Sequence, residues 1–562
     1  MTLLMKQVEI PVKLLAQRGL DGRHAESYLP VAIGNKLNIS PKHLTNIQVL
    51  KKSTDARHKG DIILRYQVCF DVEQEDQLLQ KRSGLLEKMP SSAKTHPLDD
   101  IRQGARPKFR HKPIVVGSGP AGIFSALILA EAGYPCLVIE RGQAVEQRMR
   151  DVHKLRRTGD FKEESNYCYG EGGAGTFSDG KLSSGKNHPL IEYLFDEWVR
   201  FGAPPEILYD AKPHIGTDYL MKIARNMRLY LQERGVEFVF ESRMDDWIPQ
   251  PEGASARHKI TLSGGQTLET DHLLLAIGHS ARETYHMLRK RGLEMAPKPF
   301  AMGARFEHPQ AVIDKIQFGQ CTLLPPAEYK LVSHAPGDRG IWTFCMCPGG
   351  HLLPTSAQAS HLAINGMSYH SRSSGFANAA VVVNVRREDF FKGDIFDGMY
   401  LQESIEKKAF EMGGRNYFSP AQRLNDFLNA KLSTGSLLSS YKPGVTSSRL
   451  DHLLPEFIVN SLKYGLHEYN KTMKGFINED AVVVGVETKT SSPIVMPRDK
   501  SFQSQSHPGF FPTGEGAGFA GGIVSAALDG VRVGLAVLQD AAANSPSRTT
   551  HVLSPTPLEQ KI

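Results

Sequence analysis

The stretch that decides the fold is residues 113–141, PIVVGSGPAGIFSALILAEAGYPCLVIER. An apolar strand at 114–116 runs into Gly-x-Gly-x-x-Gly at 117–122. A helix is expected over 123–132, and a second strand at 137–139 ends at Glu140. Glycines between a strand and a helix, with an acid at the end of the next strand, are typical of a dinucleotide-binding βαβ unit. The alternative is an ordinary βαβ unit with a Gly-rich turn.

Each residue of this pattern has a physical role. Gly117 permits the tight turn out of the strand, Gly119 lets the backbone approach a diphosphate, and Gly122 lets the helix pack closely on the strand. The amino end of the helix offers free N–H groups and a partial positive charge to the phosphates. Glu140 is expected to accept hydrogen bonds from the ribose hydroxyls of the adenosine.

Two later stretches favour FAD as the dinucleotide. Residues 270–278, TDHLLLAIG, indicate an apolar strand closed by a glycine, and residues 509–534, GFFPTGEGAGFAGGIVSAALDGVRVG, indicate a strand, Gly-Glu and a helix. Both resemble short motifs of two-dinucleotide-binding flavoproteins, in which Glu515 would hold a ribityl hydroxyl and the helix after Gly521 would point at the flavin. The other Gly-x-Gly-x-x-Gly matches, at 170–175 and 516–521, do not form a second Rossmann unit, so no dedicated NAD(P)H domain is evident.

Nearly the whole chain resembles a known family. The stretches that carry the resemblance are KKSTDARHKGDI, GEGGAGTFSDGKL, AKPHIGTDYL, FCMCPGG, NGMSYHSR, GVETKTSSP and PTGEGAGFAGGI, in that order. They resemble the uncharacterised FAD-utilising (NAD/FAD-dependent) dehydrogenase family of bacteria and plastids, within the two-dinucleotide-binding flavoprotein class. The resemblance implies a small N-terminal module, a discontinuous FAD domain and an inserted middle domain. It implies no substrate.

We therefore expect an α/β fold in which a discontinuous FAD-binding Rossmann-like domain carries an inserted α+β middle domain and a small N-terminal α/β (βαββ) module. The expected segments are the N-terminal module 1–90, a linker 91–112, the first FAD-binding part 113–296, the substrate-binding middle domain 297–475, the C-terminal FAD-binding part 476–544 and a disordered tail 545–562.

Composition excludes some classes of protein. No stretch approaches the roughly 20 apolar residues that span a bilayer. We see no secretory signal, and six cysteines are too few for a disulfide scaffold, so we expect a cytoplasmic protein with reduced thiols. Residues 1–112 carry 20 Lys and Arg against 12 Asp and Glu, while the other 450 residues sum to −1. A solvated surface, attraction to an anionic membrane, or RNA docking through Lys51, Lys52, Arg57 and Lys59 would each explain this basic module.

Candidate catalytic residues lie in two stretches. The Gly-rich loop 170–182 would bring backbone close to the flavin, with Lys181 favouring the anionic reduced form; the alternative is a flexible surface loop. Cys345 and Cys347 form Cys-x-Cys. They would be a redox-active or substrate-lining pair, buried structural thiols, or metal ligands, although two ligands are too few for tetrahedral zinc.

Four basic side chains are further candidates. Arg282 and Arg305 could receive an anionic substrate. His214 and His279 flank the expected cofactor segments, and each is either a proton-transfer group or a structural histidine.

The predicted catalytic residues are thus Lys181, Cys345 and Cys347, with no metal site. The predicted FAD-binding residues are Gly117, Gly119, Pro120, Ala121, Gly122, Glu140, Arg141, Gly172, Gly173, Gly175, Thr176, Met244, Gly278, Gly514, Glu515, Gly522 and Ile523.

These residues predict an FAD-dependent oxidoreductase acting on a small-molecule substrate, with NAD(P)H as a candidate electron donor. One alternative is an RNA-acting flavoprotein that docks nucleic acid through its basic module. Another is an interaction protein in which FAD is a structural or sensing ligand. The sequence leaves the substrate and the oligomeric state open.

Overall fold

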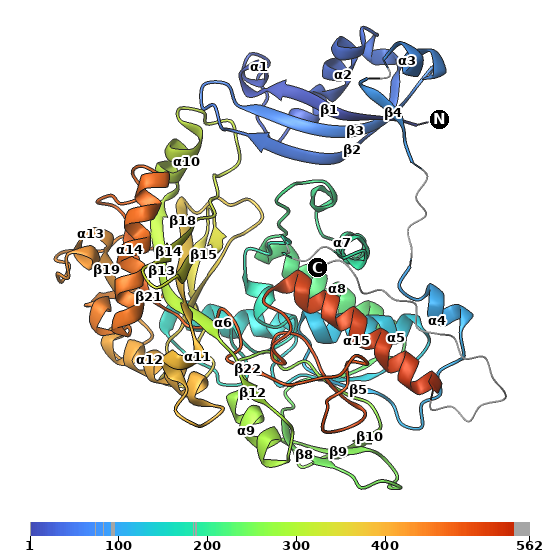
Figure 1. The fold of residues 1–562 in the computed structure, drawn as a ribbon, viewed down its shortest axis with the longest axis vertical. Helices are drawn as coiled ribbons and strands as arrows, with labels where there is room; N and C mark the ends of the chain where they lie inside the picture. Colours follow the sequence, from blue (N-terminus) through green and yellow to red (C-terminus); the bar gives the residue numbers. More distant parts are fainter. Residues whose placement is uncertain are drawn as a thin grey trace.

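The computed structural model describes residues 2–73, 75–82, 84–90, 96–183, 185 and 188–543. Figure 1 shows a small N-terminal module, a domain built around a parallel sheet, and a middle domain built around a larger mixed sheet. This is the α/β architecture expected from the sequence. The predicted tail, 545–562, and residues 91–95 of the predicted linker lie outside the described residues.

A five-stranded parallel sheet forms the FAD-type domain. Its strands are β5 (Ile114–Val116), β6 (Leu137–Ile139), β7 (Glu237–Val239), β11 (Leu273–Leu275) and β23 (Phe510–Pro512), in the order β23-β11-β5-β6-β7. The carboxyl ends of parallel strands meet at one edge of a sheet. The glycine turn after β5, Glu140 after β6 and Glu515 after β23 therefore gather there.

Two long helices pack together beside this sheet (Figure 1). These are α5 (Pro120–Glu131) and α15 (Ile523–Ala543). A Cβ on Gly530 would lie 2.1 Å from the carbonyl oxygen of Ala121, so a glycine is needed for this close approach. Ser125 Oγ donates to the carbonyl of Gly530 at 2.9 Å. Segments 400 residues apart thus form one unit, as the discontinuous domain requires.

Other elements complete the domain. Its helices include α6 (Val145–Thr158), α7 (Leu190–Arg200), α8 (Thr217–Glu233) and α9 (Arg282–Lys290), and β8 (Met244–Pro249), β9 (His258–Leu262) and β10 (Thr267–Thr270) form a three-stranded antiparallel sheet. The predicted linker 91–112 also contributes α4 (Asp99–Gln103), preceded by the fully buried Leu98. The linker is therefore partly folded onto the domain, because Leu98 packs into its core.

The middle domain is built on a seven-stranded sheet of order β14-β15-β18-β13-β21-β19-β20. The strands are β13 (Phe300–Pro309), β14 (Val332–Ala335), β15 (Arg339–Cys347), β18 (Phe376–Val385), β19 (Ser419–Arg423), β20 (Val445–Ser447) and β21 (Val482–Glu487). Helices α10 (Gln310–Phe318), α12 (Asp397–Gly413) and α14 (Glu456–Thr472) pack on it, and β16 (His351–Pro354) pairs with β17 (Ile364–Met367).

One predicted boundary is corrected by this sheet. The sequence analysis assigned 476–544 to the FAD-binding part, but β21 pairs with β13 and β19 of the middle sheet. The middle domain therefore extends to Glu487. An apolar VVV run fits a Rossmann strand and an internal strand of the middle sheet equally well, so its pattern does not identify its partners.

The N-terminal module is a four-stranded antiparallel sheet of order β2-β3-β1-β4. The predicted βαββ order appears as β1 (Leu3–Pro11), α2 (Leu29–Leu37), β2 (Leu44–Asp55) and β3 (Ile63–Val72). The unpredicted additions are α1 (Val12–Ala16), α3 (Glu75–Lys81) and β4 (Leu86–Lys88). The module is joined to the rest by backbone pairing: Lys52 N–H donates to Tyr209 O at 2.8 Å, and Ala211 N–H to Lys52 O at 2.9 Å.

Among the residues that the structure describes, no helix combines the length and apolar character needed to cross a membrane.

Candidate active site

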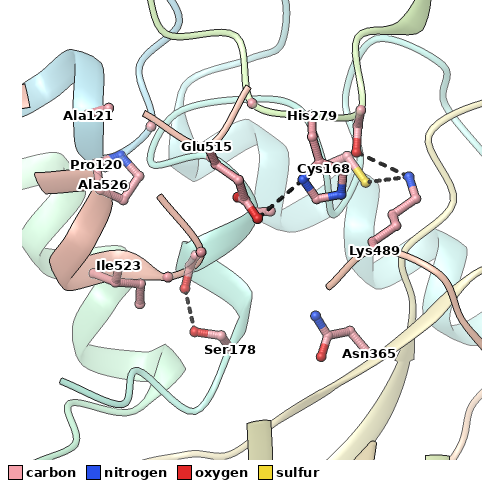
Figure 2. A pocket seen from close by; sticks show the side chains of 18 of the residues that line it. Pro120, Ala121, Cys168, Ser178, His279, Asn365, Lys489, Glu515, Ile523 and Ala526 are labelled. Carbon is pink, nitrogen blue, oxygen red and sulfur yellow. Dashed lines mark hydrogen bonds and ion pairs between the residues drawn. The ribbon is translucent and has the colours of Figure 1, made fainter. Parts of the chain in front are cut away.

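A cavity of about 700 Å³ lies at the carboxyl edge of the parallel sheet, where the middle domain faces it (Figure 2). Most of the predicted site residues line it: Gly117, Gly119, Pro120, Ala121, Glu140, Arg141, Gly173, Gly175, Lys181, Met244, Gly278, Cys345, Glu515, Gly522 and Ile523. The predicted residues that do not line it are Gly122, Gly172, Thr176, Gly514 and Cys347.

The glycine turn fits a diphosphate. Gly119 is the N-cap of α5, and a Cβ added there would meet only the Cα of Gly173, at 3.8 Å, so the space in front of this turn is open to the cavity. Gly122 instead faces the strand turn, because a Cβ there would lie 1.9 Å from Gly117 O. The amino end of α5 therefore presents its backbone N–H groups to the cavity, the arrangement that binds phosphate.

Glu140 lies at the end of β6 as predicted, but its carboxylate is already hydrogen-bonded. It accepts from the N–H and Oγ of Ser118, at 3.0 and 2.7 Å, and from the N–H groups of Gly142 and Gly170, at 2.9 and 3.0 Å. These four donors fill its lone pairs. Glu140 thus joins the glycine turn to the Gly-rich loop, and the expected contact with a ribose hydroxyl remains a prediction.

The Gly-rich loop 170–182 is not a flexible surface loop, because a buried arginine holds it. Arg148 of α6 is fully buried, and burial lowers its pKa to about 10. Its guanidinium donates to five backbone carbonyls, those of Asn166, Tyr167, Gly170, Glu171 and Gly173. Sequence reasoning missed Arg148, since an arginine in the charged stretch VEQRMRDVHKLRR gives no signal of burial.

Lys181 lines the cavity, but its charge is compensated. Its ammonium lies 2.7 Å from a carboxylate oxygen of Asp179, which is fully buried and also pairs with Arg372 at 2.8 Å. The role predicted for Lys181 is to favour an anionic reduced flavin. That effect would therefore depend on the combined charge of Lys181, Asp179 and Arg372.

The two cysteines of Cys-x-Cys occupy different places. A bulge in β15 follows Phe344, and Cys345 has a φ of 44°, in the left-handed region. Cys345 lines the cavity, whereas Cys347 is fully buried and its Sγ donates to Cys345 O at 3.3 Å. A regular strand would have pointed both side chains to one face. All six cysteines are free thiols, and among the described residues no cluster of three or more His, Cys, Asp and Glu could hold a metal.

The environment of Cys345 stabilises its thiolate. The hydrogen bond from Cys347 is the largest influence, and the positive charges of Arg305 and Lys181 add to it; together they lower the pKa of the Cys345 thiol, against the opposing effect of burial. The hydrogen bond with Cys345 is the largest influence that raises the pKa of the Cys347 thiol, and burial adds to it.

Neither candidate arginine is free to receive an anion. Arg282 is 3% exposed and makes a bidentate ion pair with Glu406, with both contacts at 2.9 Å. Arg305 is fully buried and lies 2.8 Å from Glu487. These arginines are structural because each one is already neutralised by a buried carboxylate.

The two candidate histidines also differ. His214 stacks on His370, and burial lowers its pKa to about 3, so it stays neutral at physiological pH. His279 lines the cavity, with Nδ1 3.3 Å from a carboxylate oxygen of Glu515 (Figure 2).

The C-terminal motif is anchored by a carboxylate that sequence reasoning did not single out. Asp529 of α15 accepts from Gly514 N–H at 2.7 Å and from Arg498 at 2.9 Å. This holds the turn after β23, so that Glu515 reaches the cavity. Gly522 and Ile523, at the amino end of α15, line the cavity, and their contact with FAD remains a prediction.

The basic N-terminal residues are partly neutralised. Lys52 lies 2.6 Å from Glu26, and Arg57 lies 2.5 Å from Asp55. RNA docking through this surface remains an untested expectation.

Comparison with known families supports the FAD assignment. Residues 110–158 match the model of an FAD binding domain, residues 299–490 match one described as FAD-dependent protein, C-terminal domain-like, and residues 5–71 match a domain of unknown function. An uncharacterised protein of Clostridium beijerinckii is 39% identical over 507 residues, which cover 89% of this chain and 94% of that protein.

Several solved structures are similar to the chain at low identity. One is a mutant of the halogenase PltM in complex with FAD (11% identity, TM-score 0.38, covering 77% of this chain and 70% of that one). Another is a flavoprotein/dehydrogenase from Cytophaga hutchinsonii (14%, 0.34, 77% and 79%). A third is a geranylgeranyl bacteriochlorophyll reductase-like protein from Thermoplasma acidophilum (14%, 0.34, 78% and 80%).

Proposed function

Because this chain belongs to the family of FAD-dependent flavoproteins that it shares with the Clostridium beijerinckii protein, we propose that it is an FAD-dependent oxidoreductase acting on a small molecule, with NADH or NADPH as electron donor. One observation carries the proposal: a single cavity is lined by the glycine turn, the Gly-rich loop, the C-terminal motif and a thiol of the middle domain.

Bound FAD would supply the transfer of electrons, and the protein residues would bind and orient both reactants. The amino end of α5 would hold the diphosphate, and Glu515 would accept a ribityl hydroxyl. The aromatic side chains of Trp342 and Phe344 line the cavity from the middle domain and would help to exclude water. Cys345 is the cavity thiol suited to contact a substrate, because its environment favours the thiolate.

The test is anaerobic reduction of the purified protein. We expect a yellow protein with FAD near one per chain, whose visible flavin absorption is bleached by NADH or NADPH. Bleaching by neither, together with bleaching by an alcohol or an amine, would contradict the donor but not the oxidoreductase. A protein that binds no FAD would contradict the whole proposal.

A further inference from the structure

Lys489 is a buried cation that makes no ion pair with a carboxylate of the described residues. It follows β21 and is 9% exposed. Its ammonium lies 3.1 Å from Ser280 Oγ and 3.6 Å from Cys168 Sγ, and it lines the cavity (Figure 2). Within the part of the chain that the structure describes, no carboxylate lies within ion-pair distance of it. A buried charge normally has a partner, so this ammonium is suited to an anion.

The carboxylate of Glu406, whose charge acts on Lys489, already has other hydrogen-bond partners. The carboxylate of Glu406 is attracted by Lys489, but it accepts two hydrogen bonds from Arg282 and one from Thr488. Arg282 therefore holds the carboxylate of Glu406, besides lying 3.7 Å from Glu403, and the ammonium of Lys489 is left facing the cavity.

A second donor faces the same cavity. The side-chain oxygen of Asn365, in β17, accepts from the guanidinium of Arg305 and from Gly366 N–H. An arginine has no acceptor atom, so the amide must present its oxygen to Arg305 and its NH₂ group to the other side. Figure 2 shows this nitrogen facing the cavity, and in the described residues it has no hydrogen-bond partner.

We propose that Lys489 and Asn365, here called the donor wall, bind the anionic group of the substrate, a carboxylate or a phosphate. The inference rests on the proposed function, because it assigns the substrate class of the same cavity. Both residues belong to the middle domain or its immediate continuation, whereas the proposed diphosphate site is at α5 of the FAD-type domain. The donor wall is therefore assigned to a second ligand rather than to FAD.

The test uses the FAD-loaded protein with acetate and inorganic phosphate as probes. Binding is followed by calorimetry and by the change in visible flavin absorption. We expect saturable binding of at least one probe, and the tighter of the two identifies carboxylate or phosphate as the ligand chemistry. Lys489→Met should weaken binding by about tenfold or more, since a charge-assisted hydrogen bond is lost, and Lys489→Arg should retain part of it.

Asn365→Asp is the sharper variant. An aspartate keeps the shape of the side chain and can pair with Arg305, so the fold should be retained, but it places an oxygen where the NH₂ group faced the cavity. We expect anion binding to fall by about tenfold or more with an unchanged melting temperature. Lys407→Met removes an exposed lysine of α12 outside the cavity and should bind the probes like the unmodified protein.

Three results would overturn the proposal: no binding of either probe, equal binding by Lys489→Met and Lys407→Met, or loss of FAD from Lys489→Met. The last would assign the ammonium to the cofactor. Calorimetry on the FAD-loaded protein separates this question from the proposed function, because the donor wall can bind an anion even where neither NADH nor NADPH reduces the flavin.

Discussion

The carboxylate of Glu140 accepts both the backbone N–H and the hydroxyl of Ser118, at 3.0 and 2.7 Å. The acid at the end of the second strand therefore fixes the glycine turn that follows the first. Its other oxygen accepts N–H groups of Gly142 and Gly170. The geometry of the glycine turn, the proposed diphosphate site, thus depends on a side chain that the sequence pattern would assign to the ribose alone.

Glu140→Gln should destabilise the protein and weaken FAD binding together. A glutamine turns one acceptor oxygen into a donor that faces existing N–H groups, at a cost of about 1–3 kcal/mol. Denaturant unfolding and FAD titration would measure both effects. Ser118→Ala removes only the hydroxyl and should cost about 1 kcal/mol. Equal stability of Glu140→Gln and the unmodified protein would show that this network does not support the turn.

Gly119→Ala should fold normally yet bind FAD poorly. Its Cβ would make an ordinary contact at 3.8 Å within the protein, while filling space that a diphosphate needs. We expect the dissociation constant for FAD to rise about tenfold or more. Equilibrium dialysis of FAD with the apoprotein would measure it.

Gly122→Ala is the matched control for that experiment. Its Cβ would lie 1.9 Å from Gly117 O, so the helix must move, and we expect a loss of about 3 kcal/mol or more in the free energy of unfolding. If both alanine variants bound FAD normally, the diphosphate would not lie against this turn.

Arg148→Lys should loosen the Gly-rich loop. A lysine has one ammonium with three donors and cannot reach the five carbonyls that the guanidinium binds. We expect destabilisation by about 3 kcal/mol or more, and faster limited proteolysis within 163–177. Cleavage rates equal to those of the unmodified protein would mean that the loop is held by other contacts.

Alkylation of Cys345 should report its lowered pKa. Because the thiolate is the reactive form, modification by iodoacetamide should reach its half-maximal rate below the pH of roughly 8.5 at which an ordinary thiol does so. Peptide mapping by mass spectrometry would distinguish Cys345 from Cys168, which also lines the cavity.

Two variants test the cause of that shift. Cys347→Ala and Lys181→Met each remove an influence that lowers the pKa of Cys345, so both should move the alkylation midpoint to higher pH. Lys407→Met should leave it in place. A midpoint that is moved by neither the change at position 347 nor Lys181→Met would contradict the assigned causes.

The fingerprint and the C-terminal motif were predictable because their glycines and acids are tied to backbone geometry. Gly122 allows the close packing of helix on strand that its spacing predicted, Gly119 faces the open cavity, and the strand within 270–278 joins the same sheet. Local spacing determines such features, so one sequence is sufficient to recognise them.

The parts of the site that could not be predicted from the sequence depend on contacts between distant segments. Arg305 was a candidate for binding an anion, but Glu487, 182 residues later, neutralises it. Lys489 differs from Arg305 in this respect. Its neighbour Glu406 pairs with Arg282 instead, so the ammonium of Lys489 can still bind a ligand. Tertiary packing decides which basic side chain pairs with a buried carboxylate, and no local sequence pattern indicates that choice.

The backbone pairing between Lys52 and residues 209–211 has a practical consequence. The next two residues, Lys212 and Pro213, line the cavity. A shortened chain without the N-terminal module would leave the amide of Ala211 and the carbonyl of Tyr209 unpaired directly beside the site. A loss of activity in such a shortened chain would therefore reflect a disturbed cavity lining at Lys212 and Pro213. It would not by itself show that the first ninety residues bind other macromolecules.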